Sequence, residues 1–322
     1  MPDLNVAILG CGRMGKERAR CSSAVGAKIT AVYDPDTERS AVMAAQYGAA
    51  ALLSEQEIPW HSLDAVFFCT PPNCRESQAL PAIHAGVAFM AEKPVGLSRL
   101  AAAQVGDALK RSPVVNAIGY MNRCRASVQH ARSVLAGTRL LGLSGYWVCR
   151  PYTVPWWLDS AASGGPLNEQ ATHLFDLYRF LGGEITALNT IPTDPTASAE
   201  QSLGSASVLQ FRSGALGTLF YSCESNGKTL GLHLFTDCGS IEFSGWDFRM
   251  TANTIDGTFP EVETEDVFLL ETEQFLEAVR SHSLRGVGCD WEDALLTQSV
   301  VDTARTSLNE HRTNTAVFAD GR

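Results

Sequence analysis

Short apolar runs alternate with segments of helical periodicity through the first third of the chain. Each run ends near a glycine, a proline or a polar residue, which is typical of strands buried on both faces. The runs lie at residues 4–9, 28–33, 64–69, 87–90 and 114–118, and the helical segments between them lie at about 14–25, 38–47, 75–85 and 98–111. Strands that alternate with helices through short connections predict an α/β fold, a doubly wound parallel sheet with right-handed crossovers.

The pattern changes after about residue 120. Strand-like segments joined by short polar turns fill most of the region from 185 to about 253, and such turns join antiparallel strands. Helices are predicted at about 125–136, 167–181, 266–282 and 291–308. We therefore predict two domains, a doubly wound domain over 1–120 and an α+β domain with a mostly antiparallel sheet over 121–322.

A glycine-rich loop follows the first predicted strand. It reads Gly10-Cys11-Gly12-Arg13-Met14-Gly15 and opens a predicted helix, the context in which this motif cradles the pyrophosphate of a dinucleotide. Asp34 ends the second strand, where a carboxylate accepts hydrogen bonds from an adenosine ribose and repels a 2′-phosphate. These features predict NAD in preference to NADP. Arg39 leaves NADP open, and a glycine turn in a nucleotide-free sheet is the alternative for the loop.

The fourth predicted strand ends in Glu92-Lys93-Pro94. Pro94 fixes its own φ and favours an extended conformation for Lys93. A lysine on such a turn, at the edge where a doubly wound sheet binds ligands, is a candidate catalytic group, and Glu92 is expected to shape the turn. The segment Thr70-Pro71-Pro72-Asn73 follows the third strand at the same edge. It is expected to contact the cofactor, although turning the chain is an equally good role.

These segments resemble the glucose–fructose oxidoreductase / inositol dehydrogenase (Gfo/Idh/MocA) family of NAD(P)-dependent oxidoreductases. Four stretches carry the resemblance in the family's order: Gly10–Gly15, Thr70–Asn73, Glu92–Pro94 and Gly164–Asp176. The resemblance covers almost the whole chain. It implies an NAD-binding Rossmann domain, then a domain with a large open-faced sheet that is often buried in a homodimer or homotetramer. It also implies that one or both C-terminal helices return to the first domain.

Two positions depart from the family pattern. The family usually has Asp-x-x-x-His on the helix of the last stretch, whereas this chain has Glu169 and His173, whose i, i+4 spacing still puts both on one helical face. Arg75 stands where the family often has a histidine, five residues after Thr70. This arginine is expected either to change only the solvent edge of the cofactor cleft or to add a cation near a charged substrate.

The resemblance implies oxidation of a secondary alcohol, which requires a hydride acceptor and a base for the hydroxyl proton. His173 is the predicted base, because histidine titrates near neutral pH. Lys93 is predicted to hydrogen-bond the same hydroxyl and stabilise alkoxide character, and Glu169 to orient the histidine or bind a neighbouring hydroxyl. Lys93 as the base is the alternative. A non-catalytic dinucleotide-binding regulator on the same fold is the rival function.

The substrate class that the resemblance implies is a sugar, a cyclitol or a nucleotide-linked sugar, with oxidation at the 3-OH of a UDP-N-acetylhexosamine favoured and a dihydrodiol left open. Three arginines would suit a diphosphate: Arg75, Arg123 and Arg150. For Arg123 a surface ion pair is the alternative. Tyr152 is expected to meet an anionic group beside Arg150. Trp156 and Trp157 are expected to stack on a sugar or, equally, to fill an interface, and a structural role for Asp176 is at least as good as a catalytic one.

Composition excludes several function classes. The formal charge is −10, with 25 basic and 35 acidic residues and no basic run, which argues against nucleic acid and anionic membranes as partners. The nine cysteines form no C-x-x-C pair, so we predict no metal site and no disulfide framework. No segment approaches about 18 uninterrupted apolar residues, and we expect no secretory leader before the first strand. A cytoplasmic location is therefore expected.

Overall fold

The computed structural model describes residues 4–254, 257–259 and 266–314, and the chain divides into two compact units. Unit 1 comprises Met1–Met121 and Asp266–Leu295, and unit 2 comprises Asn122–Glu265 and Leu296–Arg322. Each unit has its own buried apolar core. Among the described residues, no helix combines the length and the apolar character needed to cross a bilayer.

Unit 1 is built on a six-stranded parallel sheet in the order β3-β2-β1-β4-β5-β6. Its strands are β1 Asn5–Leu9, β2 Lys28–Tyr33, β3 Ala50–Leu52, β4 Ala65–Phe68, β5 Ala88–Ala91 and β6 Asn116–Ile118. Its helices are α1 Arg13–Ala24, α2 Thr37–Tyr47, α3 Arg75–Ala85, α4 Arg99–Arg111 and α9 Val267–Ser281. The predicted doubly wound parallel sheet is confirmed.

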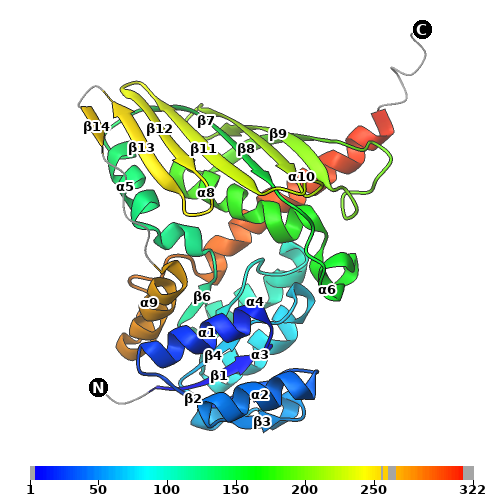
Figure 1. Cartoon of the computed structure of the whole chain (residues 1–322), viewed down its shortest axis with the longest axis vertical. Coiled ribbons are helices and arrows are strands. Elements are labelled where there is room, and N and C mark those ends of the chain that lie inside the picture. The colour runs from blue at the N-terminus through cyan, green and yellow to red at the C-terminus, as the bar shows by residue number, and fades with distance from the viewer. Residues whose placement is uncertain (1–3, 255–256, 260–265, 315–322) are drawn as a thin grey trace. The chain divides into compact units, whose positions relative to one another are not determined.

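Both faces of this sheet are covered, which explains why its strands read as continuous apolar runs. Val6 and Ile8 of β1 pack in one core with residues of α1, α2 and α9, whereas Ala7 and Leu9 pack in the other with residues of α3 and α4. Figure 1 shows α1 and α9 running next to each other on one side. The sequence pattern missed β3, a three-residue edge strand in which only Leu52 is buried.

Unit 2 is built on an eight-stranded sheet in the order β14-β13-β12-β11-β7-β10-β9-β8. Its neighbours pair antiparallel except β7 with β10, so the predicted mostly antiparallel sheet is confirmed. Its strands are β7 Leu140–Val148, β8 Ile185–Pro192, β9 Gly204–Phe211, β10 Leu216–Ser222, β11 Thr229–Thr236, β12 Gly239–Ser244, β13 Arg249–Thr254 and β14 Gly257–Phe259.

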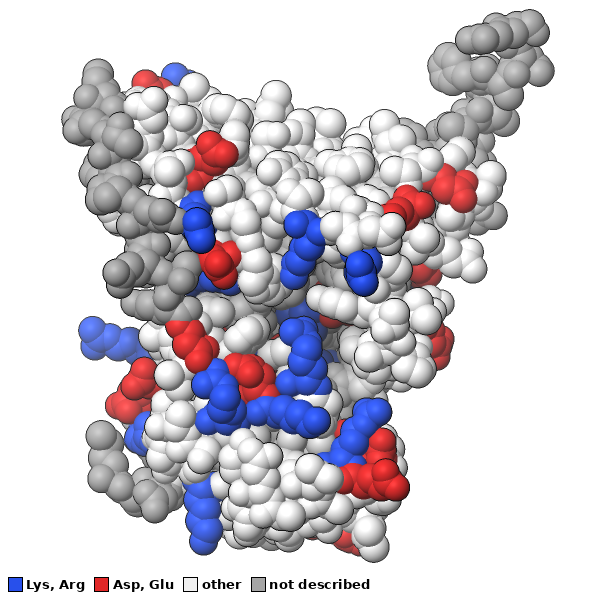
Figure 2. All heavy atoms as spheres, in the orientation of Figure 1, with Lys and Arg blue, Asp and Glu red and all other residues white. Residues whose placement is uncertain are grey.

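Helices cover one face of the sheet of unit 2, and Figure 1 shows α5, α8 and the later part of α10 on that side. The helices are α5 Ala126–Leu135, α6 Pro155–Leu158, α7 Ser160–Ser163, α8 Thr172–Gly182 and α10 Trp291–Asn314, whose first residues, to Leu295, belong to unit 1. Large apolar side chains are exposed on several of the strands, among them Tyr146 of β7, Val208 of β9 and Phe220 of β10. In Figure 2, few acidic or basic side chains lie over these strands.

Candidate functional site

The glycine-rich loop of unit 1 leaves no room for side chains at two of its glycines. A Cβ on Gly10, whose φ is +92°, would lie 2.7 Å from the backbone carbon of Cys69, and one on Gly15 would lie 1.8 Å from the carbonyl oxygen of Gly10. A Cβ on Gly12 would meet no atom within 4 Å, so this glycine leaves open space before the first turn of α1. Open space at a helix N-terminus, where backbone N–H groups have no helical partner, suits a phosphate. The loop therefore fits a dinucleotide, with Arg13 and Met14 as the first helical residues.

Asp34 is fixed at the end of β2 by two backbone amides. Its Oδ2 accepts a hydrogen bond from the N–H of Cys11 at 2.6 Å, and its Oδ1 accepts one from the N–H of Asp36 at 2.9 Å. The carboxylate is thus fastened to the glycine-rich loop, at the position predicted for an adenosine ribose. Arg39, which left NADP open, forms an exposed ion pair with Asp36 at 2.9 Å.

Two buried arginines brace the turn that carries Lys93. Nε of Arg75 donates to the carbonyl oxygen of Glu92 at 3.0 Å, and Nε of Arg18 donates to Oε1 of Glu92 at 2.8 Å. The N–H of Glu92 donates to the carbonyl oxygen of Phe68 in the neighbouring strand. Glu92 is thus held at its backbone and at its side chain, and the half-buried Lys93 follows directly at the carboxyl end of β5.

Arg75 lies inside unit 1, where it is almost fully buried. Besides the bond to Glu92, its Nη1 donates to the hydroxyl of Thr70 at 3.1 Å, and that hydroxyl donates to Gln78 at 2.6 Å. Neither expectation for Arg75, a change at the solvent edge or a cation for substrate, describes this placement. Arg75 connects the residues that follow β4 and β5, and it thereby holds the lysine turn from inside unit 1. Asn73 lies beside it in a single 3₁₀ turn, Pro72–Cys74, that follows Pro71.

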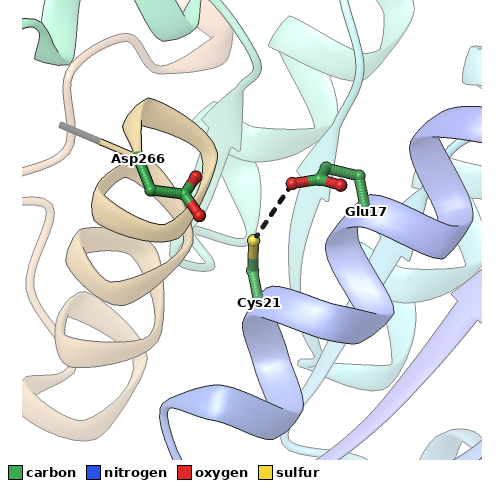
Figure 3. Close-up of side chains that lie close together, drawn as sticks. All are labelled: Glu17, Cys21 and Asp266. Atoms are coloured by element: carbon green, nitrogen blue, oxygen red, sulfur yellow. Dashed lines mark hydrogen bonds between the residues drawn. The ribbon is translucent and has the colours of Figure 1, made fainter. Parts of the chain in front are cut away.

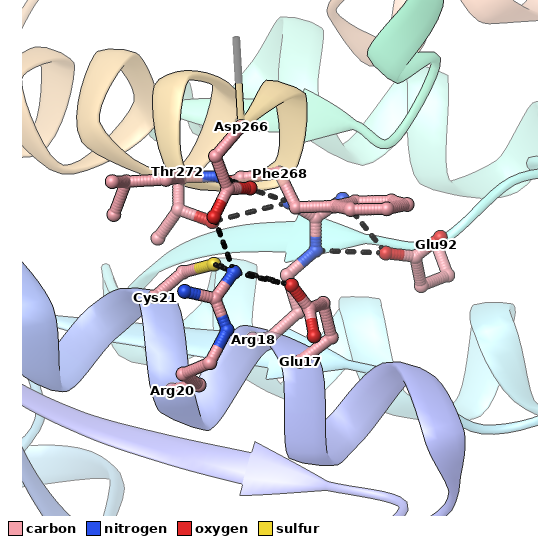
Figure 4. A network of polar contacts seen from close by, with 9 residues as sticks. Glu17, Arg18, Arg20, Cys21, Glu92, Asp266, Phe268 and Thr272 are labelled. Carbon is pink, nitrogen blue, oxygen red and sulfur yellow. Dashed lines mark hydrogen bonds and ion pairs between the residues drawn. The ribbon is translucent and has the colours of Figure 1, made fainter. Parts of the chain in front are cut away.

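Arg18 belongs to a polar network that joins α1, β5 and α9 within unit 1 (Figure 4). Its guanidinium forms ion pairs with Glu92 and with Glu271, and its Nη1 donates to the hydroxyl of Thr272 at 3.1 Å. Both carboxylates favour the charged guanidinium, and the pKa of Arg18 is raised despite burial, which acts in the opposite direction. The network fastens the helix after the glycine-rich loop to the strand that delivers Lys93.

One group of potential metal ligands lies beside this network. Glu17, Cys21 and Asp266 present ligand atoms within 4.8 Å of one another. Figure 3 shows Glu17 and Cys21 on α1 and Asp266 at the start of α9. The guanidinium of Arg20 occupies the same space, because its Nη2 donates to Glu17, to Asp266 at 2.6 Å and to the sulfur of Cys21 at 3.3 Å. A cation already balances these carboxylates, so the group is explained as an ion-pair cluster.

His173 lies in the first turn of α8, in unit 2, and its ring stacks on Trp147 of β7. The two ring centroids are 5.3 Å apart and the planes differ by 8°. Residues Leu167–Ala171, which precede α8, form a π-helical turn, a feature often found at functional sites. This turn contains Glu169. Sequence spacing predicted one helix over the whole region and did not show the π-helical turn.

Glu169 is buried and accepts a hydrogen bond from the indole N–H of Trp157 at 2.7 Å. Trp157 comes from the short helix α6 and packs edge-to-face on Tyr152, at 5.8 Å between ring centroids. Trp157 therefore positions Glu169, the third residue of the π-helical turn. The position of Trp157 in an aromatic loop of the sequence did not indicate this role. Trp156, its neighbour in α6, is half-buried and packs against the apolar core of the unit.

Arg123 forms a buried bidentate ion pair within unit 2. Its Nε donates to Oδ2 of Asp176 at 2.8 Å and its Nη2 donates to Oδ1 at 2.6 Å, while its guanidinium lies over the ring of Phe180. Thr297 donates to the same carboxylate at 3.0 Å. This pairing accounts for the burial of both charges. A role for Arg123 in binding substrate stays a prediction.

Arg150 and Tyr152 line a small pocket beyond the carboxyl end of β7, together with Trp147 and Lys228. Sequence reasoning missed Lys228 because it lies 78 positions after Arg150 in a polar turn. It also missed Arg18, Glu271 and Trp147. The signal for Arg18 was a charged residue among the otherwise small buried residues of α1, and no local signal pointed to the others.

Comparisons with known proteins agree with this architecture. Residues 4–120 match the family model of the oxidoreductase family, NAD-binding Rossmann fold, and residues 129–242 match that of the GFO/IDH/MocA C-terminal domain. The chain is 26% identical over 301 residues to scyllo-inositol 2-dehydrogenase (NAD(+)) of Bacillus subtilis (strain 168), across 85% of this chain and 86% of that protein. It is 30% identical over 195 residues to inositol 2-dehydrogenase of Leifsonia xyli subsp. xyli (strain CTCB07), across 58% of this chain and 56% of that protein. The second match thus spans little more than half of the relative's length.

Solved structures share the fold across nearly the whole chain. UDP-N-acetylglucosamine 3-dehydrogenase from Acidithiobacillus ferrooxidans superposes with a TM-score of 0.85 at 21% identity, covering 97% of this chain and 100% of that one. Levoglucosan dehydrogenase in complex with NADH and levoglucosan superposes with a TM-score of 0.84 at 18% identity, covering 96% and 98%. At these identities the likeness establishes the fold alone.

Proposed function

Because the chain belongs to the GFO/IDH/MocA family of oxidoreductases, whose first domain binds NAD, we propose that it oxidises a secondary hydroxyl of a sugar, a cyclitol or a related polyol and transfers the hydride to NAD. The observation that carries this proposal is the braced turn before Lys93. Two buried arginines hold Glu92 at the carboxyl end of β5, the edge at which doubly wound sheets bind ligands. A protein that only bound a nucleotide would have no need to fix a lysine so firmly.

Different residues of unit 1 bind different parts of the dinucleotide. The first turn of α1 binds the pyrophosphate through backbone N–H groups, with Gly12 leaving room for its approach. Asp34 accepts hydrogen bonds from the adenosine ribose and disfavours a 2′-phosphate, which selects NAD. Thr70, Pro71 and Asn73 follow β4 at the same edge of the sheet. When bound, NAD supplies the hydride acceptor, carbon C4 of the nicotinamide.

Three side chains of this protein orient the substrate and transfer its proton. Lys93 donates a hydrogen bond to the oxygen of the hydroxyl that is oxidised, which stabilises negative charge as it develops there. His173 accepts the hydroxyl proton, and its stack on Trp147 limits the orientations of its ring. Glu169, held by Trp157, hydrogen-bonds a neighbouring hydroxyl of the substrate. Lys93 as the base is the alternative assignment.

Among substrates, a UDP-N-acetylhexosamine oxidised at its 3-OH remains a candidate, since a structure of the same fold is named for that reaction. Two of the three arginines predicted for its diphosphate, Arg75 and Arg123, are engaged in buried bonds within their own units. A free sugar or cyclitol is therefore the better-supported substrate class, in agreement with the inositol dehydrogenases among the relatives.

The decisive experiment is NADH formation, followed at 340 nm, with the purified protein across free hexoses, inositols and UDP-sugars. Lys93→Ala and His173→Ala are expected to lose activity by at least about a hundredfold. The matched controls are Lys110→Ala and His84→Ala, which remove exposed side chains from unit 1. Tight NAD binding without turnover on any substrate would favour the non-catalytic regulator, and activity that survives in both variants would overturn the assigned roles.

A further inference from the structure

A pocket of unit 2 that is lined by Trp147, the residue stacked on His173, has a fixed frame. Its lining residues are Trp147, Cys149, Arg150, Tyr152, Asn226, Gly227 and Lys228, from the end of β7 and from the loop that connects β10 to β11. The loop is fastened to the strand end at two points. The N–H of Ser225 donates to the carbonyl oxygen of Cys149 at 3.0 Å, and Nη2 of Arg150 donates to the carbonyl oxygen of Asn226 at 3.0 Å.

Among the described residues that line this pocket, two are cations and none carries a carboxylate. Nζ of Lys228 lies 3.2 Å from the ring centroid of Trp246 and 5.9 Å from that of Trp147, so two indoles hold the ammonium group. Arg150 stands on the other segment of the frame. Glu224, the one acidic residue of the connecting loop 223–228, is not among the lining residues. This is a local positive site on a chain whose formal charge is −10.

The size of the pocket limits what it can hold. Its volume is about 100 Å³, roughly that of three water molecules, whereas whole-ligand sites usually measure about 300–1,000 Å³. This size suits one compact group. Trp147 lines this pocket and stacks on His173, so the pocket and the imidazole share one indole.

We propose that this pocket binds a carboxylate or phosphate substituent of the substrate, and that the enzyme prefers an acidic sugar or cyclitol, such as a uronate or a sugar phosphate, to a neutral one. The identity of the polyol part rests on the proposed function, whereas the binding of the anionic group does not. Arg150 and Lys228 contact the anion, and Trp147 separates it from the imidazole that receives the proton.

The first test is binding in the absence of NAD, so that it does not depend on turnover. Isothermal titration compares D-glucuronate, D-glucose 6-phosphate, inorganic phosphate and D-glucose, which separates a carboxylate from a phosphate and each from the neutral ring. We expect the two acidic sugars to bind at least about tenfold more tightly than glucose, because a hydrogen bond to a charged group is stronger than one to a neutral group. Equal binding of glucose and both acids would overturn the proposal.

Variants of the two cationic residues test whether the acidic group binds in this pocket. Lys228→Met keeps the aliphatic stem, and Arg150→Met removes the second cation; each is expected to weaken binding of the acidic sugars by about tenfold or more. Arg212→Met is the matched control, since Arg212 is exposed in the same unit at the turn where β10 begins, away from its end near the pocket. Unchanged binding in both test variants, or an equal loss in the control, would contradict the site.

Kinetics then distinguish this proposal from the proposed function. If the enzyme turns over, the ratio of kcat/KM for an acidic sugar to that for its neutral counterpart should fall at least about tenfold in Lys228→Met, and rising salt should raise KM for the acid alone. If no polyol is oxidised but the binding differences hold, the proposed function fails and the anion site stands. If neutral sugars are oxidised as well as acidic ones and the variants change nothing, the proposed function stands and the anion site fails.

Discussion

Arg18 lies against Glu92: its Nε donates to Oε1 of the carboxylate at 2.8 Å, and both side chains are buried. A Cβ at Gly119 would come within 3.1 Å of the guanidinium and 3.0 Å of the carboxylate, so the chain leaves space for this pair. Glu92 directly precedes Lys93. The ion pair therefore transmits the position of α1, which begins at the dinucleotide loop, to the turn that carries the candidate catalytic lysine.

Removing the guanidinium should destabilise the protein strongly. Arg18→Met leaves Glu92 and Glu271 buried without their counter-charge, and breaking a buried ion pair typically costs about 3–5 kcal/mol. Arg20→Met is the matched control on the same helix, because Arg20 also pairs with two acidic groups but its side chain is 47% exposed, against 1% for Arg18. Exposed pairs contribute about 0–1 kcal/mol. Urea unfolding measures both, and equal losses would show that burial does not govern the effect.

The second arginine of the lysine turn should affect catalysis more than cofactor binding. Arg75→Met removes the donor to the carbonyl oxygen of Glu92 and the bond to Thr70. A displacement of the turn by about 1 Å can lower rates by about a hundredfold. We therefore expect kcat to fall at least about tenfold while the Kd for NAD changes little, measured by steady-state kinetics and by fluorescence titration. A loss confined to NAD affinity would place Arg75 among the cofactor contacts instead.

The local sequence pattern predicted most of the fold, but it could not predict contacts between residues that are far apart in the chain. The strands of unit 1 are buried on both faces and are therefore apolar along their length, which made five of the six recognisable; β3, with only Leu52 buried, offered no such run. The glycine spacing identified the dinucleotide loop because the motif itself is local, and Gly15 is crowded by Gly10 of the same loop, whereas the crowding of Gly10 by Cys69 is a long-range contact.

The partners of the candidate site could not be found in the same way. Arg18 and Glu271 are 253 positions apart, and no periodicity connects a residue of α1 with one of α9. Arg75 illustrates the same limit: its position in the motif was visible, but whether it pointed to solvent or to the carbonyl oxygen of Glu92 depended on how β4 and β5 lie in the sheet. Side-chain direction at such positions follows from tertiary packing.

Cofactor choice should depend on Asp34. Its carboxylate repels a 2′-phosphate, so Asp34→Ala is expected to lower the preference for NAD over NADP by about a hundredfold in kcat/KM, since like charges in contact cost several kcal/mol. Glu38→Ala is the control from the first turn of α2, because that acidic side chain is exposed. Comparison of NAD and NADP reduction tests this. An unchanged ratio in Asp34→Ala would show that another residue excludes NADP.

The thiol of Cys11 should be inert at ordinary pH. Burial, aided by the nearby carboxylate of Asp34, raises the pKa of Cys11 from 9.0 to about 12. Because the folded pKa lies above the unfolded value, the thiol stays protonated at pH 8 in the folded protein, and the stability it contributes is lost between about pH 9 and 12. Iodoacetamide at pH 8 followed by peptide mass spectrometry should leave Cys11 unmodified in the native protein and modify it in urea. Rapid native labelling would contradict the burial.

The open face of the sheet in unit 2 should mediate self-association. Phe220 of β10 and Tyr146 of β7 are paired in register and are 43% and 40% exposed, with Val208 exposed on β9. Exposed apolar patches of this kind mark interfaces, and we expect the wild type to be a homodimer or homotetramer. Phe220→Glu places a charge there and should yield monomers in analytical ultracentrifugation. Val42→Glu is the control, because Val42 is 64% exposed on α2 of unit 1 and its replacement should leave the assembly intact. A monomeric wild type, or dissociation by the control alone, would exclude this face as the interface.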